Sequence, residues 1–347
     1  GVAGIEAKYN EALAGVDGSK TYERSATGGE IPTGTGNETD SQPGASYQLT
    51  INRDLQWIAQ QQVNASVKRF DAESATVVVM DPRTGRLLAL AQAPTSDPNN
   101  ELTRNADQLK NNSVEQAFDP GSTGKVITAA AVLEEGKADA STVFNVPNRL
   151  PRPNGDGVFQ FRDDVDHPLY KMTFAGVLAQ SSNIGTIQAA EMIGKEKQYE
   201  YLKKFGMGSS TGLGLPSENR GEVPPLEKWR DLTFPNVAYG QGYSANAIQM
   251  TSVFSTIANK GVRVTPRIID SKIDPDGTVE RLPEGPTTRV VSEETTKKLM
   301  PMLEQVVLER GTAQDVAAIK GYRVAGKTGT AQLYNPKANG GKGGYSG

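Results

Sequence analysis

Residues 118–136 read FDPGSTGKVITAAAVLEEG, and this stretch decides how the chain is interpreted. A Pro-Gly pair ends a polar region, an apolar helical pattern follows it, and Gly136 is a residue type that commonly ends a helix. Residues three apart lie on one face of a helix, so Ser122 and Lys125 are predicted to be neighbours in its first turn. No other serine of the chain has a lysine three positions later.

The composition limits which base could activate Ser122. A serine hydroxyl is a poor nucleophile unless a base removes its proton. The chain has no cysteine and one histidine, His167, which lies in a polar stretch before a proline and is predicted to be a solvated loop residue. Lysine is therefore the expected base. The pKa of Lys125 would have to fall by roughly three units from ~10.4, at a cost of about 4 kcal/mol, through burial, the helix N-terminus and a second cation.

Residues 327–330 read KTGT and offer that second cation. The preceding stretch 322–326 is predicted to be a strand, so Lys327, two threonine hydroxyls and a closely approaching backbone at Gly329 would be presented at a strand end. These groups suit a substrate carboxylate and an oxyanion. Alone, each motif is weak: a Ser-x-x-Lys spacing occurs roughly once by chance in such a chain, and Lys-Thr-Gly is also an ordinary exposed turn.

A Ser-x-Asn motif would complete the set, and the sequence contains three: residues 181–183, 217–219 and 244–246. Their spacing does not choose among them. The context favours 181–183, because it follows the apolar segment 174–179 and opens a predicted helix. Residues 217–219 lie in a charged loop, and residues 244–246 follow a Gly-Gln-Gly turn.

Composition and charge exclude several classes of protein. The net charge of −3 in 347 residues and the lack of a dense basic block argue against nucleic-acid binding. The absence of cysteine excludes thiol catalysis, disulfides and Cys-based zinc sites, and one histidine excludes a His-rich metal site. No run of 18 apolar residues occurs, so the sequence predicts a soluble globular chain without a membrane span.

Periodicity predicts a mixed α/β (α+β) fold. Alternation predicts a strand at 47–51, and β-branched runs at 75–80 and 86–91 flank an Asp-Pro…Gly turn that is typical of a hairpin. Residues 206–235 are rich in Gly and Pro and are predicted to be surface loops. A sheet covered by helices is expected, with helices over 53–69, 182–194, 196–205, 246–259 and 292–310.

The order Ser-x-x-Lys, Ser-x-Asn, Lys-Thr-Gly is the signature of penicillin-binding proteins and class A β-lactamases. The flanking strings LTINRDLQ (49–56), MDPRTG (80–85), QSSNIG (180–185), YGQG (239–242) and VAGKTGTAQ (324–332) make residues 46–335 resemble a class B penicillin-binding protein, closest to the septal, cell-division type of actinobacteria. Residues 1–45 resemble the end of that family's N-terminal pedestal domain and linker, which leaves 46–347 as the transpeptidase domain.

The resemblance implies the fold of penicillin-binding proteins and serine β-lactamases, an antiparallel sheet flanked by helices. In that fold two further strands and a helix follow the Lys-Thr-Gly strand, and the strands lie between it and the hairpin at 75–91. We expect the domain to be incomplete at Gly347, with these C-terminal strands missing. We also expect the 347-residue chain alone to be poorly active or unstable.

The resemblance also implies a peptidoglycan D,D-transpeptidase with no cofactor and no metal. Ser122 would attack the D-Ala-D-Ala carbonyl and Lys125 would be its base. Ser181 would relay a proton. An amine of a neighbouring stem peptide would then resolve the acyl-enzyme.

The remaining motif residues would bind the substrate. Asn183 would hold the substrate amide, and Lys327 would set the electrostatic field. The N–H groups of Ser122 and Thr330 would form the oxyanion hole, while Thr328 and Thr330, with Gly329 between them, would bind the carboxylate.

The implied partners are stem peptides, β-lactams that acylate Ser122, and division-complex proteins including a glycan polymerase, with no nucleic acid. The implied location is the outer face of the bacterial cell membrane, with an anchoring helix outside this chain.

Three other functions remain open. A class A β-lactamase would need a Glu-x-x-Leu-Asn loop, which is absent after Ser181. A D,D-carboxypeptidase fits the flanking motifs less well, and a non-catalytic β-lactam sensor or division scaffold could keep the same residues.

Gly124 departs from the family, whose members carry a bulkier residue there, and is expected to loosen the first helical turn. Ser244-Ala245-Asn246 stands where Ser-Val-Thr is commoner.

Overall fold

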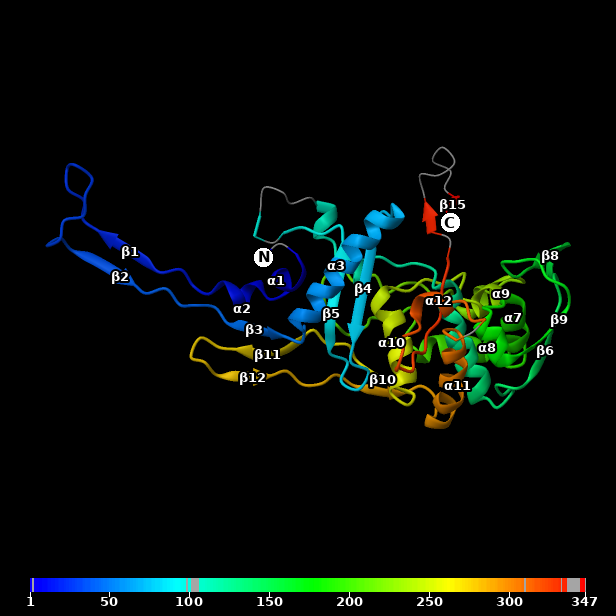
Figure 1. Cartoon of the computed structure of the whole chain (residues 1–347). Coiled ribbons are helices and arrows are strands. Elements are labelled where there is room, and N and C mark those ends of the chain that lie inside the picture. The colour runs from blue at the N-terminus through cyan, green and yellow to red at the C-terminus, as the bar shows by residue number, and fades with distance from the viewer. Residues whose placement is uncertain are drawn as a thin grey trace.

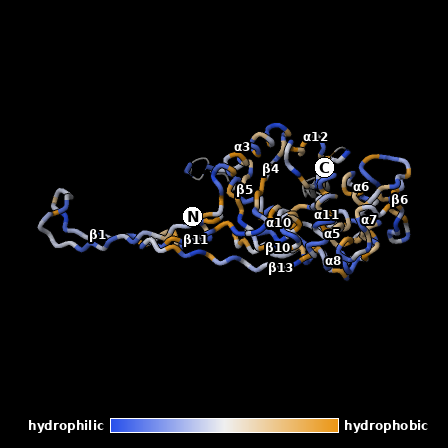
Figure 2. The backbone as a smooth tube through the Cα atoms, turned by 60° about the horizontal axis from the view of Figure 1, so that its bottom comes forward, coloured by the Kyte–Doolittle hydropathy of each residue, from blue (hydrophilic) through white to orange (hydrophobic). Residues whose placement is uncertain are grey.

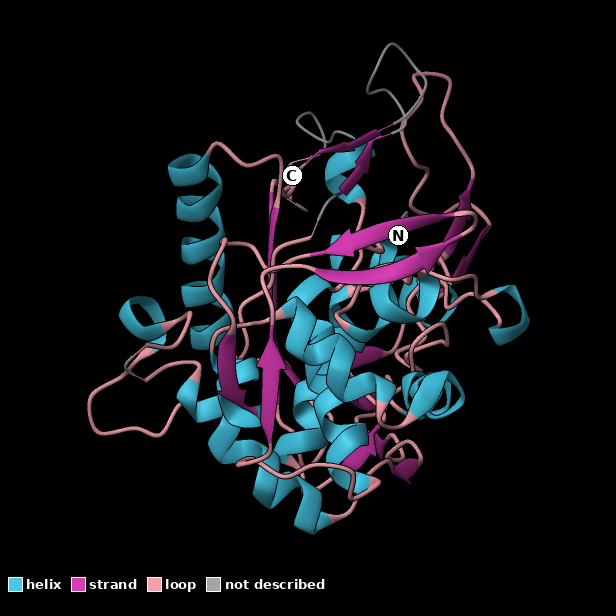
Figure 3. Cartoon of the chain, turned by 90° about the vertical axis from the view of Figure 1, so that its right-hand side faces the viewer, coloured by secondary structure: helices cyan, strands magenta, loops and turns pink. Residues whose placement is uncertain are grey.

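A computed structural model describes residues 1, 3–97, 99, 100, 106–308, 310–331, 333–335 and 344–346. Its main body consists of helices packed around a large hydrophobic core, with smaller apolar clusters on the two faces of a strand pair and several small sheets (Figures 1 and 3). Apolar residues are concentrated in this body, whereas the N-terminal ribbon is mostly polar (Figure 2). No helix among the described residues is long and apolar enough to cross a bilayer.

The helices of the body carry the candidate site. A 3₁₀ turn, Gly121–Gly124, leads directly into α5, and α5 packs against α7, α8 and α11. Ser182, Asn246 and Ser292 are the N-caps of α7, α10 and α11 and accept hydrogen bonds from backbone N–H groups in the first turn. The helices after the first hairpin are α4 (Asn112–Glu115), α5 (Lys125–Glu134), α6 (Phe174–Ala179), α7 (Asn183–Glu191), α8 (Gly194–Lys204), α9 (Thr233–Ala238), α10 (Ala247–Ala258), α11 (Glu293–Gln305) and α12 (Gln314–Ala317).

A two-stranded hairpin, β4 (Ala75–Met80) and β5 (Leu87–Ala93), is sandwiched between helices. On one face Val77 and Val79 pack near α3 (Arg53–Phe70), and on the other Val78 packs in the cluster that contains Ile248 of α10. Successive side chains of a strand point to opposite faces, so both faces of the hairpin are apolar. The predicted helix at 53–69 and the predicted hairpin are thus confirmed.

The other strands form small antiparallel pairs. The strand predicted at 47–51 is β3 (Ser46–Leu49), which joins β11 (Ile269–Ile273) and β12 (Val279–Arg281) in a three-stranded sheet. Two hairpin-like pairs, β6 (Val143–Val146) with β9 (Tyr170–Thr173) and β7 (Leu150–Asn154) with β8 (Gly157–Phe161), lie at the right of Figure 1 and face the viewer in Figure 3. The remaining pairs are β10 (Val262–Val264) with β13 (Thr287–Arg289), and β14 (Leu333–Asn335) with β15 (Gly344–Ser346).

Most of the first 45 residues extend away from the body, but Ile5 and Tyr9 pack against the cluster that contains Leu213 and Ile248. They contain the short helices α1 (Gly4–Lys8) and α2 (Asn10–Ala14) and a ribbon of β1 (Ser19–Tyr22) and β2 (Gly36–Thr39), which projects to the left in Figure 1. Apart from Ala45, no described residue of this part is buried. The ribbon is therefore held by its own backbone pairing rather than by a core.

Two sequence predictions about local structure are wrong. The stretch 322–326 is not a strand: residues 323–331 are irregular, because no strand among the described residues pairs with them. Residues 206–235 are not only surface loop: Met207, Leu213, Leu215 and Trp229 are buried in the core clusters.

Candidate active site

The turn that carries Ser122 is held against two other segments. Gly121 donates its N–H to Gly240 O at 2.9 Å, and its φ of +54° is a left-handed conformation that favours glycine. A Cβ at Gly121 would lie 2.4 Å from Thr330 O. Glycine at this position therefore lets the 327–330 segment approach Ser122 closely.

Gly124, which was expected to loosen this turn, is instead tightly enclosed. A Cβ at Gly124 would lie 2.5 Å from the hydroxyl of Tyr243 and 2.8 Å from Gly240 Cα. Tyr243 is buried and its hydroxyl has no hydrogen-bond partner in the described part of the chain. The volume that a larger residue would fill is thus occupied by the Tyr243 side chain.

Lys125 is fully buried at the start of α5. Its Nζ lies 2.5 Å from Ser181 O, 2.7 Å from Asn183 Oδ1 and 3.2 Å from Ser181 Oγ. Burial, followed by the positive charge of Lys327, lowers the pKa of Lys125 to about 7, although the carboxylates of Asp163 and Asp164 oppose this shift. A substantial fraction of Lys125 is therefore neutral, and able to accept a proton, near pH 7.

Lys327, the first residue of the 327–330 segment, also contacts Ser181. Its Nζ donates to Ser181 Oγ at 2.8 Å and to Thr328 O at 3.0 Å. Burial lowers the pKa of Lys327 to about 8, with the Asp164 carboxylate opposing. Lys327 thus retains its proton at a pH where part of Lys125 has lost its own.

Ser181 lies between the two amines, and the hydrogen-bond inventory gives it a direction. A neutral Lys125 has two N–H groups for its two pure acceptors, Ser181 O and Asn183 Oδ1, and leaves one lone pair. With Lys327 donating to Ser181 Oγ, the Ser181 hydroxyl hydrogen is free to point at that lone pair. Ser181 has a φ of +58°, an uncommon backbone conformation for a residue other than glycine, and such outliers cluster at functional sites.

The Ser122 hydroxyl makes no hydrogen bond to its expected base. Among the described residues its hydroxyl has no hydrogen-bond partner, and Lys125 Nζ is directed to Ser181 and Asn183 instead. Ser122 is partly exposed to a cavity of about 530 Å³. The cavity is lined by Gly121, Ser122, Phe159, Arg162, Asp163, Asp164, Asn183, Tyr239, Gln241, Thr330 and Ala331.

The residues of the KTGT stretch differ in where they lie. Thr330 lines the cavity beside Ser122, and a Cβ at Gly329 would lie 2.7 Å from Thr123 Cγ2. The Thr328 hydroxyl is instead 2.7 Å from that of Thr312, whose N–H donates to Ala179 O. Thr312 thus ties the KTGT stretch to α6, the helix that precedes Ser181.

Only the first Ser-x-Asn motif meets the lysines. In the second motif, the backbone O of Asn219 accepts a hydrogen bond from Asn246 Nδ2 of the third motif, so these two motifs contact each other. In the third, Asn246 forms a capping box with Gln249 at the start of α10, and Ser244 lines a second cavity of about 490 Å³. The context argument that selected Ser181 and Asn183 is consistent with this arrangement.

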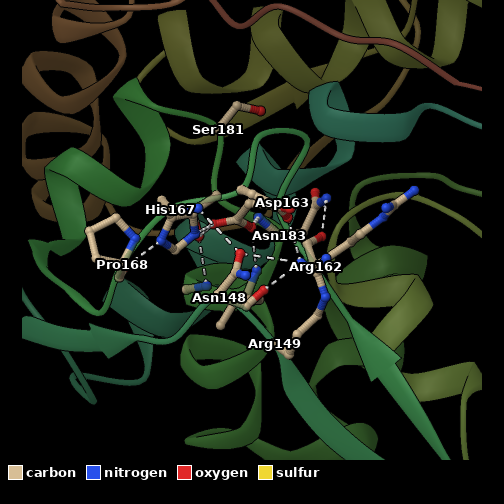
Figure 4. Close-up of polar contacts among 12 residues, drawn as sticks. Asn148, Arg149, Arg162, Asp163, His167, Pro168, Ser181 and Asn183 are labelled. Atoms are coloured by element: carbon tan, nitrogen blue, oxygen red, sulfur yellow. Dashed lines mark hydrogen bonds and ion pairs between the residues drawn. The ribbon is translucent and has the colours of Figure 1, made fainter.

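The prediction for His167 is wrong, and with it the sequence reading missed Asp163. The His167 side chain is 7% exposed and the Asp163 side chain 11% exposed, and the ring Nε2 lies 3.2 Å from Asp163 Oδ2 (Figure 4). The ring also stacks on Tyr170 at 4.7 Å between centroids. The sequence around His167 shows no helix or strand periodicity that would have predicted its burial. The burial depends on contacts that form only when the chain folds.

Comparison with known proteins agrees with the fold and the site. Residues 75–345 match the family model described as the penicillin-binding protein transpeptidase domain. The chain is 42% identical over 345 residues to penicillin-binding protein PbpB of Mycolicibacterium smegmatis, which covers 97% of this chain and 52% of that protein. It is 31% identical over 337 residues to the peptidoglycan D,D-transpeptidase FtsI of Escherichia coli, covering 97% of this chain and 54% of that protein.

Solved structures give the same result. The crystal structure of penicillin-binding protein 3 from Mycobacterium tuberculosis superposes with a TM-score of 0.87 at 37% identity, covering 100% of this chain and 73% of that one. The mixed fold and the three motifs agree with these matches. The chain belongs to the penicillin-binding protein transpeptidase family, and it spans about half the length of the curated relatives that it matches.

Proposed function

We propose that the protein is a peptidoglycan D,D-transpeptidase that cross-links stem peptides through an acyl-enzyme on Ser122, in cell-wall and specifically septal synthesis. The observation that carries the proposal is a buried Lys125 with a pKa of about 7, one helical turn from a serine at the cavity surface. A neutral amine is what a serine needs to become a nucleophile in a site without a catalytic histidine. Relatives that carry the name peptidoglycan D,D-transpeptidase support the reaction type.

In the acylation step, Ser122 Oγ forms a bond to the carbonyl carbon of the penultimate D-alanine. Neutral Lys125 accepts the Ser122 proton, directly or through Ser181. The N–H groups of Ser122 and Thr330 are proposed to stabilise the oxyanion. The C–N bond then breaks, and the proton passes from Lys125 through Ser181 to the leaving amine of the terminal D-alanine.

In the second step an amine of another stem peptide attacks the acyl carbon. Lys125 accepts a proton from this amine, the bond between Ser122 Oγ and the acyl carbon breaks, and Lys125 passes the proton to Ser122 Oγ, so that the enzyme returns to its starting state. Asn183 is proposed to bind the substrate amide once Lys125 releases its Oδ1. Lys327 and Thr330 are proposed to bind the substrate carboxylate, and Thr328 would join them only if its hydroxyl turns away from Thr312.

We further propose that β-lactams acylate Ser122 and remain bound. The M. tuberculosis relative has been solved in complexes with ampicillin and with aztreonam, which supports this. A β-lactamase needs a carboxylate free to activate water. Of the two carboxylates that line this cavity, Asp163 and Asp164, Asp163 is fully hydrogen-bonded and so not free for this role. The sequence also lacks the Glu-x-x-Leu-Asn loop that supplies the base in class A β-lactamases, which favours a long-lived adduct over turnover.

The biological setting is proposed from the family. Residues 1–45, with their projecting ribbon, would be the end of a pedestal domain, and 46–347 would belong to the transpeptidase domain. The protein would act at the outer face of the cell membrane, anchored by a preceding helix, and would bind division-complex proteins including a glycan polymerase.

A Ser122→Ala strain tests the proposal against a scaffold role. Normal protein levels with reduced cell-wall cross-linking are expected. Unchanged cross-linking would favour a non-catalytic sensor or scaffold, and rapid hydrolysis of a β-lactam by the wild-type protein would favour a β-lactamase.

A further inference from the structure

The N-terminus of α7 is capped from outside by one carboxylate. Asp163 Oδ1 accepts from the N–H of Asn183 at 2.6 Å and of Ile184 at 3.0 Å, and Oδ2 accepts from Ser182 Oγ at 2.7 Å. Ser182 in turn accepts from Gly185 N, as an N-cap does. A negative charge at the first turn of a nine-residue helix is stabilised by its unpaired N–H groups and its dipole.

His167 holds that carboxylate from the other side. Its Nε2 lies 3.2 Å from Asp163 Oδ2 and its Nδ1 lies 2.6 Å from Pro168 O (Figure 4). Both ring nitrogens thus face oxygen atoms that accept hydrogen bonds, and an N–H at Nε2 ties the ring to the Asp163 carboxylate. A charged pair near the ring is Asp166 with Arg149, at 2.7 Å.

The same loop fixes the amide of Asn183. Its Nδ2 donates to the backbone O of Arg162 at 3.1 Å, and its Oδ1 accepts from Lys125 Nζ at 2.7 Å. Asn183 thus has its backbone set by Asp163 and its side chain set by the residue before Asp163. In Figure 4, Asp163 lies between the His167 ring and Asn183, while Ser181 points away from this cluster.

We propose that Asp163 and His167 are a positioning pair, which fixes the first turn of α7 and so sets where Asn183 meets the substrate amide and Lys125. The inference rests on the proposed function, because its effect is read as the rate of acylation at Ser122. Neither residue touches the reacting atoms. The Asp163 carboxylate has a second, electrostatic effect, since its charge raises the pKa of Lys125.

The experiment measures the second-order rate of acylation of the purified protein by a fluorescent penicillin across pH. Asp163→Asn is expected to slow acylation by up to about 100-fold, the loss that a misplacement of about 1 Å at a reacting centre can cause. It should also move the acid limb of the pH profile to lower pH, because one of the two carboxylates that raise the pKa of Lys125 is gone while the other, Asp164, remains. A purely structural defect would lower the rate without moving that limb.

The matched control is Asp166→Asn. It removes the same charge from the same loop, but Asp166 is 69% exposed and pairs with Arg149 rather than with α7. Its rate and pH profile are expected to equal those of the wild type. Equal losses in the Asp163 and Asp166 variants would overturn the proposal.

Two substitutions test His167. Phe keeps a ring to stack on Tyr170 but has no N–H, whereas Gln keeps an N–H donor for Asp163. His167→Gln is expected to acylate several-fold faster than His167→Phe, and equal rates for His167→Phe and the wild type would refute the role of the histidine.

Folding and function are separated by two further measurements. Thermal unfolding reports whether each variant is folded. If Asp163→Asn does not fold, Asp163→Glu replaces it. Asp163→Glu should acylate more slowly than the wild type without a shift of the acid limb, because it keeps the negative charge. An acylation rate equal to that of the wild type would count against the proposal. If the Ser122→Ala variant is still labelled by the fluorescent penicillin, the proposed function is wrong, whatever the results for the Asp163 and His167 variants.

Discussion

The pH dependence of acylation follows from the two lysines that flank Ser181. Burial and the charge of Lys327 lower the pKa of Lys125 from 10.5 to about 7, and burial lowers that of Lys327 to about 8. Acylation requires Lys125 neutral and, in the proposed mechanism, Lys327 protonated. The acylation rate should therefore rise as pH increases through about 7 and fall above about 8, and the two apparent pKa values belong to the coupled pair.

Lys327→Met tests the electrostatic part of this account. Methionine keeps most of the side-chain bulk, so Lys125 stays buried, but the neighbouring positive charge is removed. The acid limb should then move to a pH above about 7, because one of the two causes that lower the pKa of Lys125 is lost. The alkaline limb should disappear.

The assay is the rate of fluorescent-penicillin labelling from about pH 5.5 to pH 9.5 at constant ionic strength. Thermal unfolding over the same range controls for stability. An acid limb in Lys327→Met that stays in place or moves to lower pH would refute the reasoning, as would a wild-type rate that does not change with pH.

Three further predictions concern stability and positioning. Lys125→Met should abolish acylation yet raise the free energy of unfolding at neutral pH. A lysine pKa lowered from 10.5 to about 7 opposes folding by up to ~5 kcal/mol, and the variant regains this free energy less the contribution of the lost hydrogen bonds. Urea unfolding should show the full gain in stability below about pH 7 and no gain by pH 10.5. Gly124→Ala should destabilise the protein by about 1–3 kcal/mol through its clash with the Tyr243 hydroxyl, and Tyr243→Phe, which removes an unpaired buried hydroxyl, should recover part of that loss in the double variant but cost little alone. Thr312→Val should slow acylation more than Thr312→Ser, because only serine keeps the hydroxyl that contacts Thr328; equal rates would mean that this contact is dispensable.

Local sequence signals predicted the elements whose stability is also local. The helices α3 and α10 and the hairpin β4–β5 appeared within a few residues of their predicted ends, because periodicity, caps and turn residues all lie inside those segments. The strand expected at 322–326 did not form, since a strand needs a hydrogen-bonded neighbour that its own sequence does not provide.

The site followed the same division. The motifs predicted candidate residues, and the fold joins four of them, Lys125, Ser181, Asn183 and Lys327, by hydrogen bonds. The sequence did not predict the burial of His167 or its contact with Asp163. It also misjudged Gly124, whose environment is set by Tyr243, more than a hundred positions away.

Peptide mapping of the penicillin adduct tests the central claim most directly. The protein is incubated with benzylpenicillin, and intact mass spectrometry followed by proteolysis locates the added mass. We predict one stable adduct per molecule, on the peptide that contains Ser122, and no adduct in Ser122→Ala or in Lys125→Met. An adduct on another residue, or labelling that survives Ser122→Ala, would contradict the assignment of Ser122 as the nucleophile.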